Sequence, residues 1–254
     1  MADEVLTEIR GRVMIITLNR PEAMNAVNKD LAEQLAAACD ALDENPDVSV
    51  GVLTGNGRGF CAGMDLKAFV SSGMPIVGDR GFGGITERSA KKPLICAIEG
   101  FALAGGLEIA LSTDLLVAAR GAKLGIPETS VGLFAGAGAL LRLQRALPYQ
   151  VAMKMALTAK PISAEQAHEF GMVSELAEPG EALNVALELA EQVAKNAPLG
   201  LIASKELLRE QQGRTEAEFW EYQKAQMRIV FNSEDGVEGA TAFAEKRAPN
   251  WKAR

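Results

Sequence analysis

The sequence predicts an α/β protein with a mostly parallel sheet. Three short apolar runs have the length and composition of buried strands, and each is bounded by glycine, proline or charged residues: Val48 to Leu53, Leu94 to Ile98 and Leu115 to Ala119. Stretches with helical spacing of apolar residues separate or follow these runs, and alternating strands and helices favour parallel pairing. With 254 residues, 48% hydrophobic and 23% charged, the chain can bury a large core and needs no disulfide scaffold.

The first elements are two strands and a helix. Residues Val5 to Ile9 and Arg12 to Asn19 alternate in polarity around Gly11, which predicts a hairpin or two successive strands that end before Pro21. From Asn28 to Glu44 the apolar residues recur at helical spacing, and Asn28 stands where an N-cap is needed. This stretch is therefore expected to be an amphipathic helix.

Glycines concentrate in the middle of the chain. Of the 25 glycines, 18 lie between Gly51 and Gly138, and loops that approach a ligand need this backbone freedom. The segment from Ser71 to Gly84 is rich in glycine and serine, which predicts a mobile flap over a site.

The pattern after Leu140 is almost wholly helical. Pro198 marks a late boundary, and helices are expected over residues 199–211, 215–231 and 235–246. We therefore divide the chain into a core, residues 1–195, and a helical C-terminal subdomain, residues 196–254.

Charge and composition exclude several classes of function. The chain has 26 Lys and Arg against 33 Asp and Glu, a net charge of −7, which argues against nucleic-acid or anionic-membrane binding. No apolar run approaches the roughly 20 residues that cross a bilayer, and the acidic start does not fit a secretory signal, so a cytoplasmic location is expected.

The cysteines, Cys39, Cys61 and Cys96, are odd in number and widely spaced, so we expect buried thiols and no metal site. The one histidine, His168, falls on the exposed side of a short predicted helix and is a poor candidate for catalysis.

Two glycine-rich turns follow predicted strands and lead into predicted helices. The first spans Gly55 to Lys67, with a helix expected to begin near Asp65, and the second spans Gly100 to Leu111, with a helix expected from Gly105. Such turns direct backbone N–H groups inward, and the start of a helix adds the positive end of its dipole. Two turns of this kind that face each other would form an oxyanion hole.

Two glutamates lie in apolar surroundings. Glu108 is one helical turn after Gly105, and Glu128 follows Pro127. Carboxyl groups in such places can take different protonation states and act as an acid–base pair. The alternatives are structural: Glu108 as a core carboxylate paired with an arginine, and Glu128 as an acid in the first turn of a helix.

Two other motifs compete for interpretation. The segment from Gly57 to Ala62 fits the Gly-x-Gly-x-x-Ala of nucleotide-binding oxidoreductases, but the acidic residue about 20 positions on, Asp79, falls in the predicted flap. Ser89 and Lys92 fit a Ser-x-x-Lys pair, without the rest of that catalytic set, and are expected to be exposed.

Five segments in order resemble the signatures of the enoyl-CoA hydratase/isomerase, or crotonase, family: NRPEAMNAV, GRGFCAGMDLK, IEGFALAGGLEIALSTDL, LGIPETSVGL and SAEQAHEFGMVSEL. The likeness covers nearly the whole chain, including the closing FAEKRAPNW. It implies a spiral of ββα turns followed by helices that pack on neighbouring subunits, with trimers or dimers of trimers.

The resemblance also assigns roles to single residues. It implies an oxyanion hole from the backbone N–H groups of Met64 and Gly105, and acid–base chemistry by Glu108 and Glu128 that adds water to a 2-enoyl-CoA to give a 3-hydroxyacyl-CoA. It places Lys67 at the CoA phosphates. Further substrate contacts are implied at Ala62, Asp65 and Leu66. No cofactor is implied, since CoA arrives with the substrate.

Some positions depart from the best-known hydratases. Ala135 stands where many members have proline, and Ala139, Leu140 and Leu141 stand where they have Gly-Thr-Gln. The acyl group therefore stays open, as do a related reaction of the family (isomerase, racemase or dehydratase) and a non-catalytic acyl-CoA binder.

Overall fold

A six-stranded sheet organises the molecule in a computed structural model that describes residues 3–254. The first two strands form an antiparallel hairpin, and the other neighbours pair in parallel. In spatial order the strands are β1 (Val5–Arg10), β2 (Val13–Leu18), β3 (Val50–Gly55), β6 (Leu94–Ile98), β8 (Leu115–Ala119) and β11 (Glu175–Ala177). The predicted α/β class and its mostly parallel pairing are confirmed.

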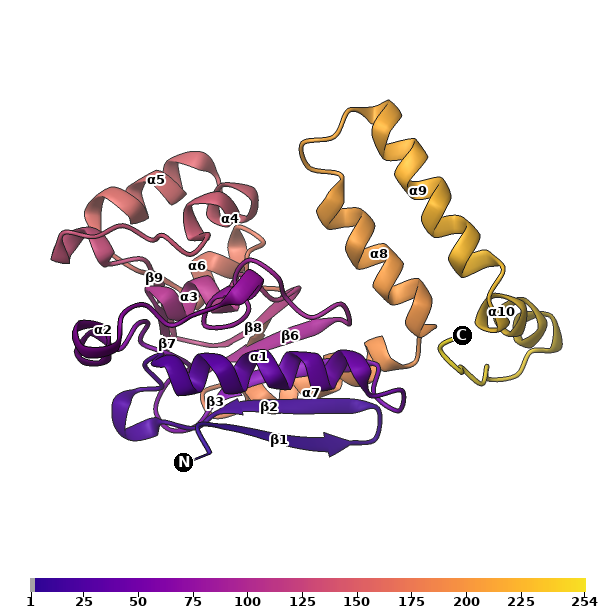
Figure 1. Cartoon of the computed structure of the whole chain (residues 1–254), viewed down its shortest axis with the longest axis horizontal. Coiled ribbons are helices and arrows are strands. Elements are labelled where there is room, and N and C mark those ends of the chain that lie inside the picture. The colour runs from indigo at the N-terminus through magenta and orange to yellow at the C-terminus, as the bar shows by residue number, and fades with distance from the viewer. Residues whose placement is uncertain (1–2) are drawn as a thin grey trace.

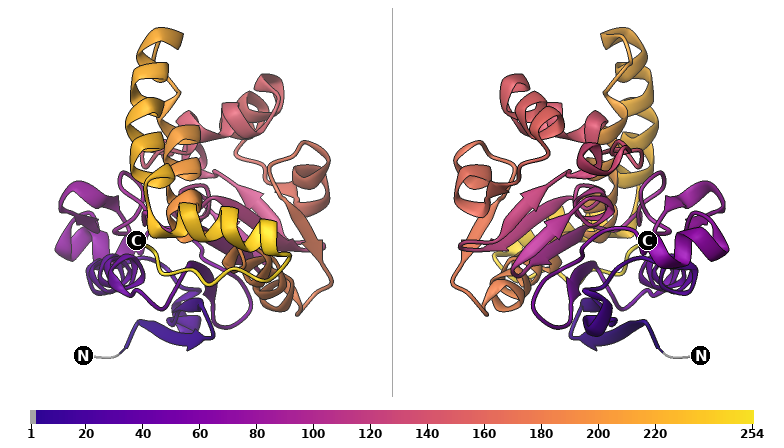
Figure 2. Two further views of the ribbon diagram at one scale, coloured as in Figure 1. Left: turned by 90° about the vertical axis from the view of Figure 1, so that its right-hand side faces the viewer. Right: turned by 90° about the vertical axis from the view of Figure 1, so that its left-hand side faces the viewer.

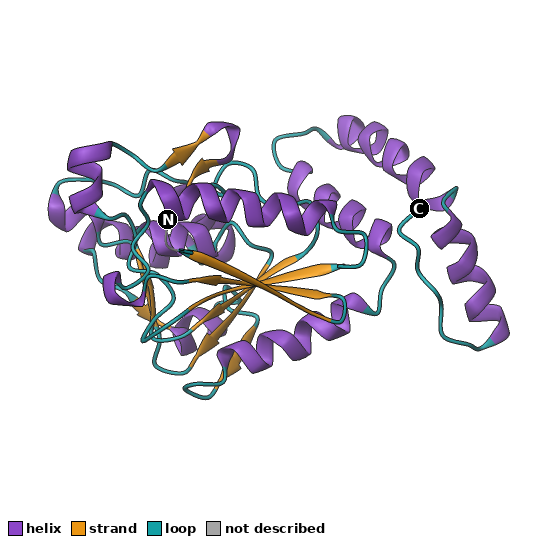
Figure 3. Ribbon diagram, turned by 60° about the horizontal axis from the view of Figure 1, so that its bottom comes forward, coloured by secondary structure: helices purple, strands orange, loops and turns teal. Residues whose placement is uncertain are grey.

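The sheet carries one layer of helices on each face (Figures 1 and 3). Alternate residues of β3 enter different cores: Leu53 packs with α1 (Lys29–Glu44), whereas Val50 and Val52 pack with α7 (Ala182–Ala194). This alternation follows from the period of two in a strand, and it explains why the strands are apolar throughout. The predicted cap of α1 is present, because the side-chain oxygen of Asn28 accepts a hydrogen bond from the Leu31 amide.

Two predictions of the strands needed correction. The strand expected from Val48 begins at Val50, because Val48 still belongs to a turn in which its N–H donates to the Asn45 carbonyl. The strand β11 lies within the stretch expected to be almost wholly helical, where it pairs in parallel with β8.

Smaller elements are stacked beside the main sheet. A second sheet has the order β10 (Ile162–Ser163), β9 (Lys123–Gly125) and β7 (Phe101–Leu103). The predicted flap, Ser71 to Gly84, holds the end of α2 (Leu66–Ser72), the paired strands β4 (Ile76–Val77) and β5 (Gly81–Phe82), and the turn η2 (Gly78–Arg80). Other short elements are η1 (Pro21–Ala23), α3 (Gly105–Ala110), η3 (Glu128–Val131), α4 (Ala139–Ala146), α5 (Tyr149–Thr158) and α6 (Ala164–Glu169).

The last three helices stand apart from the layered body (Figure 1), and they lie in front of it in the left view of Figure 2. They are α8 (Pro198–Glu210), α9 (Glu216–Phe231) and α10 (Glu234–Glu245), close to the predicted bounds. Ion pairs of Lys205 and Arg209 with Asp114 tie α8 to the core at 2.7 and 2.9 Å. The tail folds back on α10, where Asp235 accepts the amides of residues 252 and 253, and the Trp251 indole donates to the Lys195 carbonyl.

The cysteines and His168 have the predicted environments, and Lys92 does not. The three cysteines are free and buried, and burial raises the pKa of the Cys61 thiol to about 12. His168 is exposed, as expected. Lys92 is buried, contrary to expectation: its ammonium donates to the carbonyls of Leu42 and Asn45 at the end of α1, at 2.9 and 2.5 Å. Within residues 3–254, no helix is long and apolar enough to cross a membrane.

Candidate functional site

Two loops meet at the carboxyl end of the main sheet, and each brings one predicted backbone donor. The loop after β3 pairs with the residues before α1: the Val27 N–H donates to Gly63, and the Asp65 N–H donates to Val27, at 2.8 and 2.9 Å. In this parallel bridge the N–H of Met64 points away from Val27. The predicted start of α2 at Asp65 is also confirmed, since its carboxylate caps the amides of Lys67 and Ala68.

The second loop ends at the start of α3. Gly105 is the first residue of this helix, so its N–H has no partner within the helix. Among residues 3–254, the N–H groups of Met64 and Gly105 have no hydrogen-bond acceptor. A Cβ atom built on Gly105 would lie 3.6 Å from the Met64 nitrogen, so the two predicted donors are neighbours.

Backbone strain and tight packing fix this approach. Gly63 has a φ of +106°, and a Cβ there would lie 2.7 Å from the Cβ of Ala104. A Cβ on Gly105 would lie 2.5 Å from the ring of Phe82, which comes from the predicted flap. Ala104 itself has φ 51° and ψ −131°, a conformation costly for any residue except glycine. Three neighbouring positions are therefore held in a close and strained arrangement beside the two free amides.

Glu108 lies buried on α3, with 3% of its surface exposed. One carboxylate oxygen, Oε1, accepts the N–H of Ala137 at 2.7 Å and the N–H of Ala139 at 3.1 Å. Burial raises the pKa of Glu108, while these two amides and the positive charge of Arg142 lower it. The arginine pair that we considered as an alternative is not formed in the described structure, where two backbone amides hold the carboxylate.

Glu128 is the first residue of η3, so it does lie in a first helical turn. Burial and the charge of Glu108 together raise the pKa of this carboxyl group to about 7, against a hydrogen bond from its own backbone. In the described part of the chain its Oε2 atom is buried and has no hydrogen-bond partner. The two glutamates thus interact electrostatically but differ in support: the charged form of Glu108 receives two amide donors from a neighbouring turn, and that of Glu128 receives only its own backbone N–H.

The remaining predicted contacts lie around the first loop. Leu66 and Lys67 are exposed at the start of α2, and Ala62 is half-buried, with its N–H donated to the Met24 carbonyl. The carboxylate of Asp65 is engaged in the structure, because it caps α2 and pairs with Arg20 at 3.2 Å.

Sequence reasoning missed the turn that holds Glu108. Ala137 and Ala139 act through their amides, which every residue except proline possesses, so their side chains give no signal. Arg142 is the polar residue that could have been noticed, since it is a basic residue in the otherwise apolar first half of α4.

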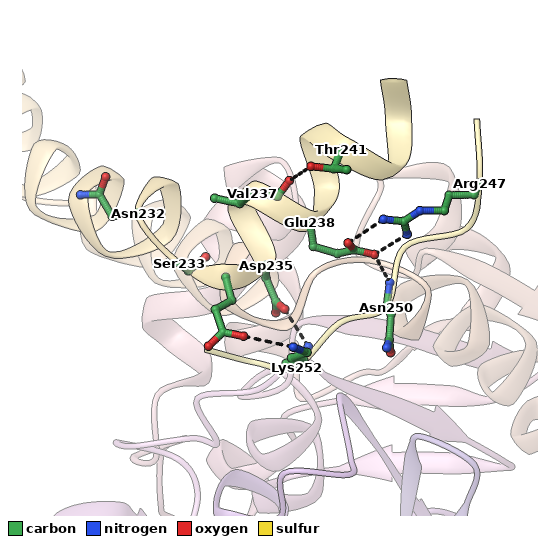
Figure 4. Close-up of a pocket in the computed structure, with 10 residues that line it drawn as sticks. Asn232, Ser233, Asp235, Val237, Glu238, Thr241, Arg247, Asn250 and Lys252 are labelled. Carbon is green, nitrogen blue, oxygen red and sulfur yellow. Dashed lines mark hydrogen bonds and ion pairs between the residues drawn. The ribbon is translucent and has the colours of Figure 1, made fainter. Parts of the chain in front are cut away.

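Two surface cavities lie away from this site, among the C-terminal helices. One, of about 580 Å³, runs between α10 and the tail (Figure 4), and the other, of about 690 Å³, lies between α8 and α9. In the first, Glu238 pairs with Arg247 (Figure 4), and Glu234 pairs with Lys252. These charged groups already satisfy one another, and neither cavity contains a glutamate of the site.

Known proteins resemble the chain along its whole length. The sequence profile described as enoyl-CoA hydratase/isomerase matches residues 8–254. The enoyl-CoA hydratase EchA19 of Mycobacterium tuberculosis is 40% identical over 258 residues, 99% of this chain and 97% of that protein. The carnitinyl-CoA dehydratase of Proteus mirabilis is 35% identical over 262 residues and all of both chains. The crystal structure of enoyl-CoA hydratase EchA1 from Mycobacterium marinum superposes with a TM-score of 0.97 at 51% identity, covering 100% of both chains.

Proposed function

Because the chain belongs to the enoyl-CoA hydratase/isomerase family, we propose that the loops and glutamates described above add water to a 2-enoyl-CoA thioester. The chain is a hydro-lyase of the crotonase type, and its product is a 3-hydroxyacyl-CoA. The observation that carries the proposal for the site is the pair of free, neighbouring amides at the start of α3, the helix that carries Glu108, together with the electrostatic interaction between Glu108 and the differently supported Glu128.

The amides of Met64 and Gly105 hold the thioester oxygen in this proposal. Attack of water on C3 moves electron density toward that oxygen, which becomes enolate-like. Donors already in position stabilise this charge without reorganising, which is the main advantage of an oxyanion hole. The strain at Ala104 and the packing of Phe82 on Gly105 support such preorganisation.

The glutamates take different roles in the proposed step. Glu108, whose charged form accepts two amides, is the carboxylate that receives a proton from the attacking water. Glu128, with a pKa near 7 and an unpartnered oxygen, is the protonated group that donates to C2. The C3–O and C2–H bonds form as the C2=C3 π bond breaks, and proton exchange between the carboxyl groups and solvent restores the starting state. CoA is part of the substrate, and the step calls on no other cofactor.

The reverse reaction, loss of water from a hydroxyacyl-CoA, uses the same groups, and a dehydratase of carnitinyl-CoA is among the relatives. This makes dehydration the second candidate, and the acyl group is the variable that separates the two. A non-catalytic acyl-CoA binder would have no use for two carboxyl groups next to the thioester.

The deciding experiment follows the enoyl thioester absorbance of crotonyl-CoA and of enoyl-CoA esters of increasing chain length. We expect loss of the band with the wild-type protein, and carnitinyl-CoA dehydration serves as the competing assay.

Glu108→Gln and Glu128→Gln should each lower kcat by ~10²-fold or more while substrate still binds. The double variant should lose far less than the product of the single effects, because the groups act together. Near-normal turnover of either single variant would remove that residue from the mechanism.

We also propose that the chain forms a homo-oligomer through α8 to α10. These helices stand apart from the body and expose large apolar side chains, among them Leu208 at 73%, Phe231 at 67% and Phe243 at 88%. Exposed apolar surface of this extent is typical of protein–protein interfaces. A trimer or a dimer of trimers, as the family resemblance implies, would cover it.

A further inference from the structure

The position of Glu108 depends on a short turn that precedes α4. Both amides that hold its carboxylate, those of Ala137 and Ala139, belong to this turn, and Gly138 between them has a φ of +105°. A displacement of the turn would separate the two donors from one carboxylate oxygen. Whatever fixes the turn therefore also fixes Glu108.

The guanidinium of Arg142 lies directly against that turn. Its Nη1 donates to the Ala137 carbonyl at 3.4 Å, and its Nη2 donates to the Thr86 carbonyl. Its backbone N–H donates to the Gly138 carbonyl at 3.1 Å, and a Cβ on Gly138 would collide with the guanidinium. Thr86 lies four residues after Phe82, whose ring packs on Gly105. Arg142 thus joins the turn that holds one catalytic glutamate to the segment that covers the oxyanion loop.

We propose that Arg142 is a positioning residue for Glu108, which clamps the turn at residues 137–139 and keeps the carboxylate charged for its role as base. This inference rests on the proposed function of Glu108. A planar guanidinium with donors in a fixed fork can bridge two carbonyls at once, which an ammonium group cannot do in the same geometry. Its positive charge also offsets part of the cost of burying a carboxylate.

The other charges around the pair are few. Glu128, on η3, faces Glu108, and the charge of Glu108 opposes the ionisation of Glu128. Arg142 faces Arg145 from its own helix and Arg209 from α8, and burial together with these cations lowers its pKa, which Glu108 raises. The balance at Glu108 therefore sets burial, which favours the protonated acid, against Arg142 and the two amides. Removal of Arg142 should shift it toward the protonated acid.

The test compares Arg142→Ala, Arg142→Lys and the control Arg145→Ala. Arg145 is exposed, three residues further along α4, and has no polar partner within the described chain. We expect Arg142→Ala to lower kcat about tenfold or more with KM within about twofold, and to move the acid limb of the kcat–pH profile upward. Arg142→Lys should keep the acid limb near the wild-type position but recover kcat only in part. Arg145→Ala should resemble the wild type in both.

A double-mutant cycle separates positioning from general damage. If Arg142 acts through Glu108, the kcat effect of Arg142→Ala should disappear in a Glu108→Gln background. Effects that multiply, or an acid limb that stays in place in a folded Arg142→Ala protein, would overturn the proposal. Infrared titration of the Glu108 carboxyl group, assigned with Glu108→Gln, reads the same shift without turnover. A wild-type protein that hydrates no enoyl-CoA would instead refute the proposed function.

Discussion

At the scale of the residue, Glu128 couples the site to the stability of the whole chain. Its carboxyl has an ordinary pKa of 4.5 and one of about 7 in the fold, so the folded state binds the proton more tightly. The stability contributed by this group is fully present below about pH 4.5 and is lost as pH rises through 7. Ionisation of Glu128 at neutral pH and above therefore lowers the free energy of unfolding.

Glu128→Gln should remove this pH dependence, because the amide cannot ionise. Relative to the wild type, its free energy of unfolding should improve by on the order of 2 kcal/mol between pH 4.5 and pH 8. Denaturant unfolding at matched protein concentration and several pH values measures the difference. Parallel stability curves for the two proteins would show that Glu128 titrates normally in the fold.

Ala104 is the second residue whose local state has a measurable consequence. Its φ of 51° and ψ of −131° suit glycine, so Ala104→Gly should relieve strain in the folded state. The gain is reduced by the greater freedom of glycine in the unfolded chain, and we expect about 1 kcal/mol of net stabilisation. Ala102→Gly is the matched control, since Ala102 lies within β7 and should lose stability instead. Equal effects at both positions would contradict the assignment of strain.

At the scale of the element, α2 carries the lysine that we propose for the CoA phosphates. With a net charge of −7 the mean field repels CoA, and the side chain of Lys67 is exposed in the first turn of this helix, three residues after Met64. Its backbone N–H is occupied by the Asp65 cap at 3.1 Å, which fixes the start of the helix and leaves the ammonium free to reach solvent.

Lys67→Ala should raise KM for an enoyl-CoA several-fold and leave kcat little changed, because a phosphate is bound alike in the ground and transition states. The variant should also show a flatter rise of KM with ionic strength, since an exposed charge is screened by salt. Lys154→Ala, an exposed lysine on α5, is the control. Identical salt slopes for wild type and Lys67→Ala would assign the phosphates to other residues.

The elements differ in how far their sequences define them. The hairpin, α1 and the C-terminal helices follow from local periodicity and caps such as Asn28, and they were predicted within a few residues. The strand β11 has only three residues and exists because β8 offers a parallel partner, which no local pattern records. In the site, Glu108 and Glu128 stand out because carboxyl groups in apolar stretches are costly. The two amide donors to Glu108 could not be predicted, since they are backbone groups brought there by tertiary packing.

At the scale of the whole molecule, the exposed apolar residues of α8 to α10 predict association. Phe231→Glu combined with Phe243→Glu places charges on this surface and should lower the molar mass in solution toward that of one chain, 26.9 kDa. Light scattering coupled to size exclusion measures the mass. Ile9→Glu, on the outer strand β1 of the body, controls for added charge and should leave the mass unchanged. An oligomer that persists in the double variant would place the interface elsewhere.

The two candidate oxyanion donors and the two donors to Glu108 share one property: all four are main-chain N–H groups, at Met64, Gly105, Ala137 and Ala139. A peptide N–H is the same whichever side chain follows it, so Met64 and the two alanines can be exchanged without erasing the chemistry, as long as the turns keep their shape. The side chains at these positions are then free to vary. A scaffold of this kind can acquire new substrates by single substitutions while its reaction is inherited unchanged.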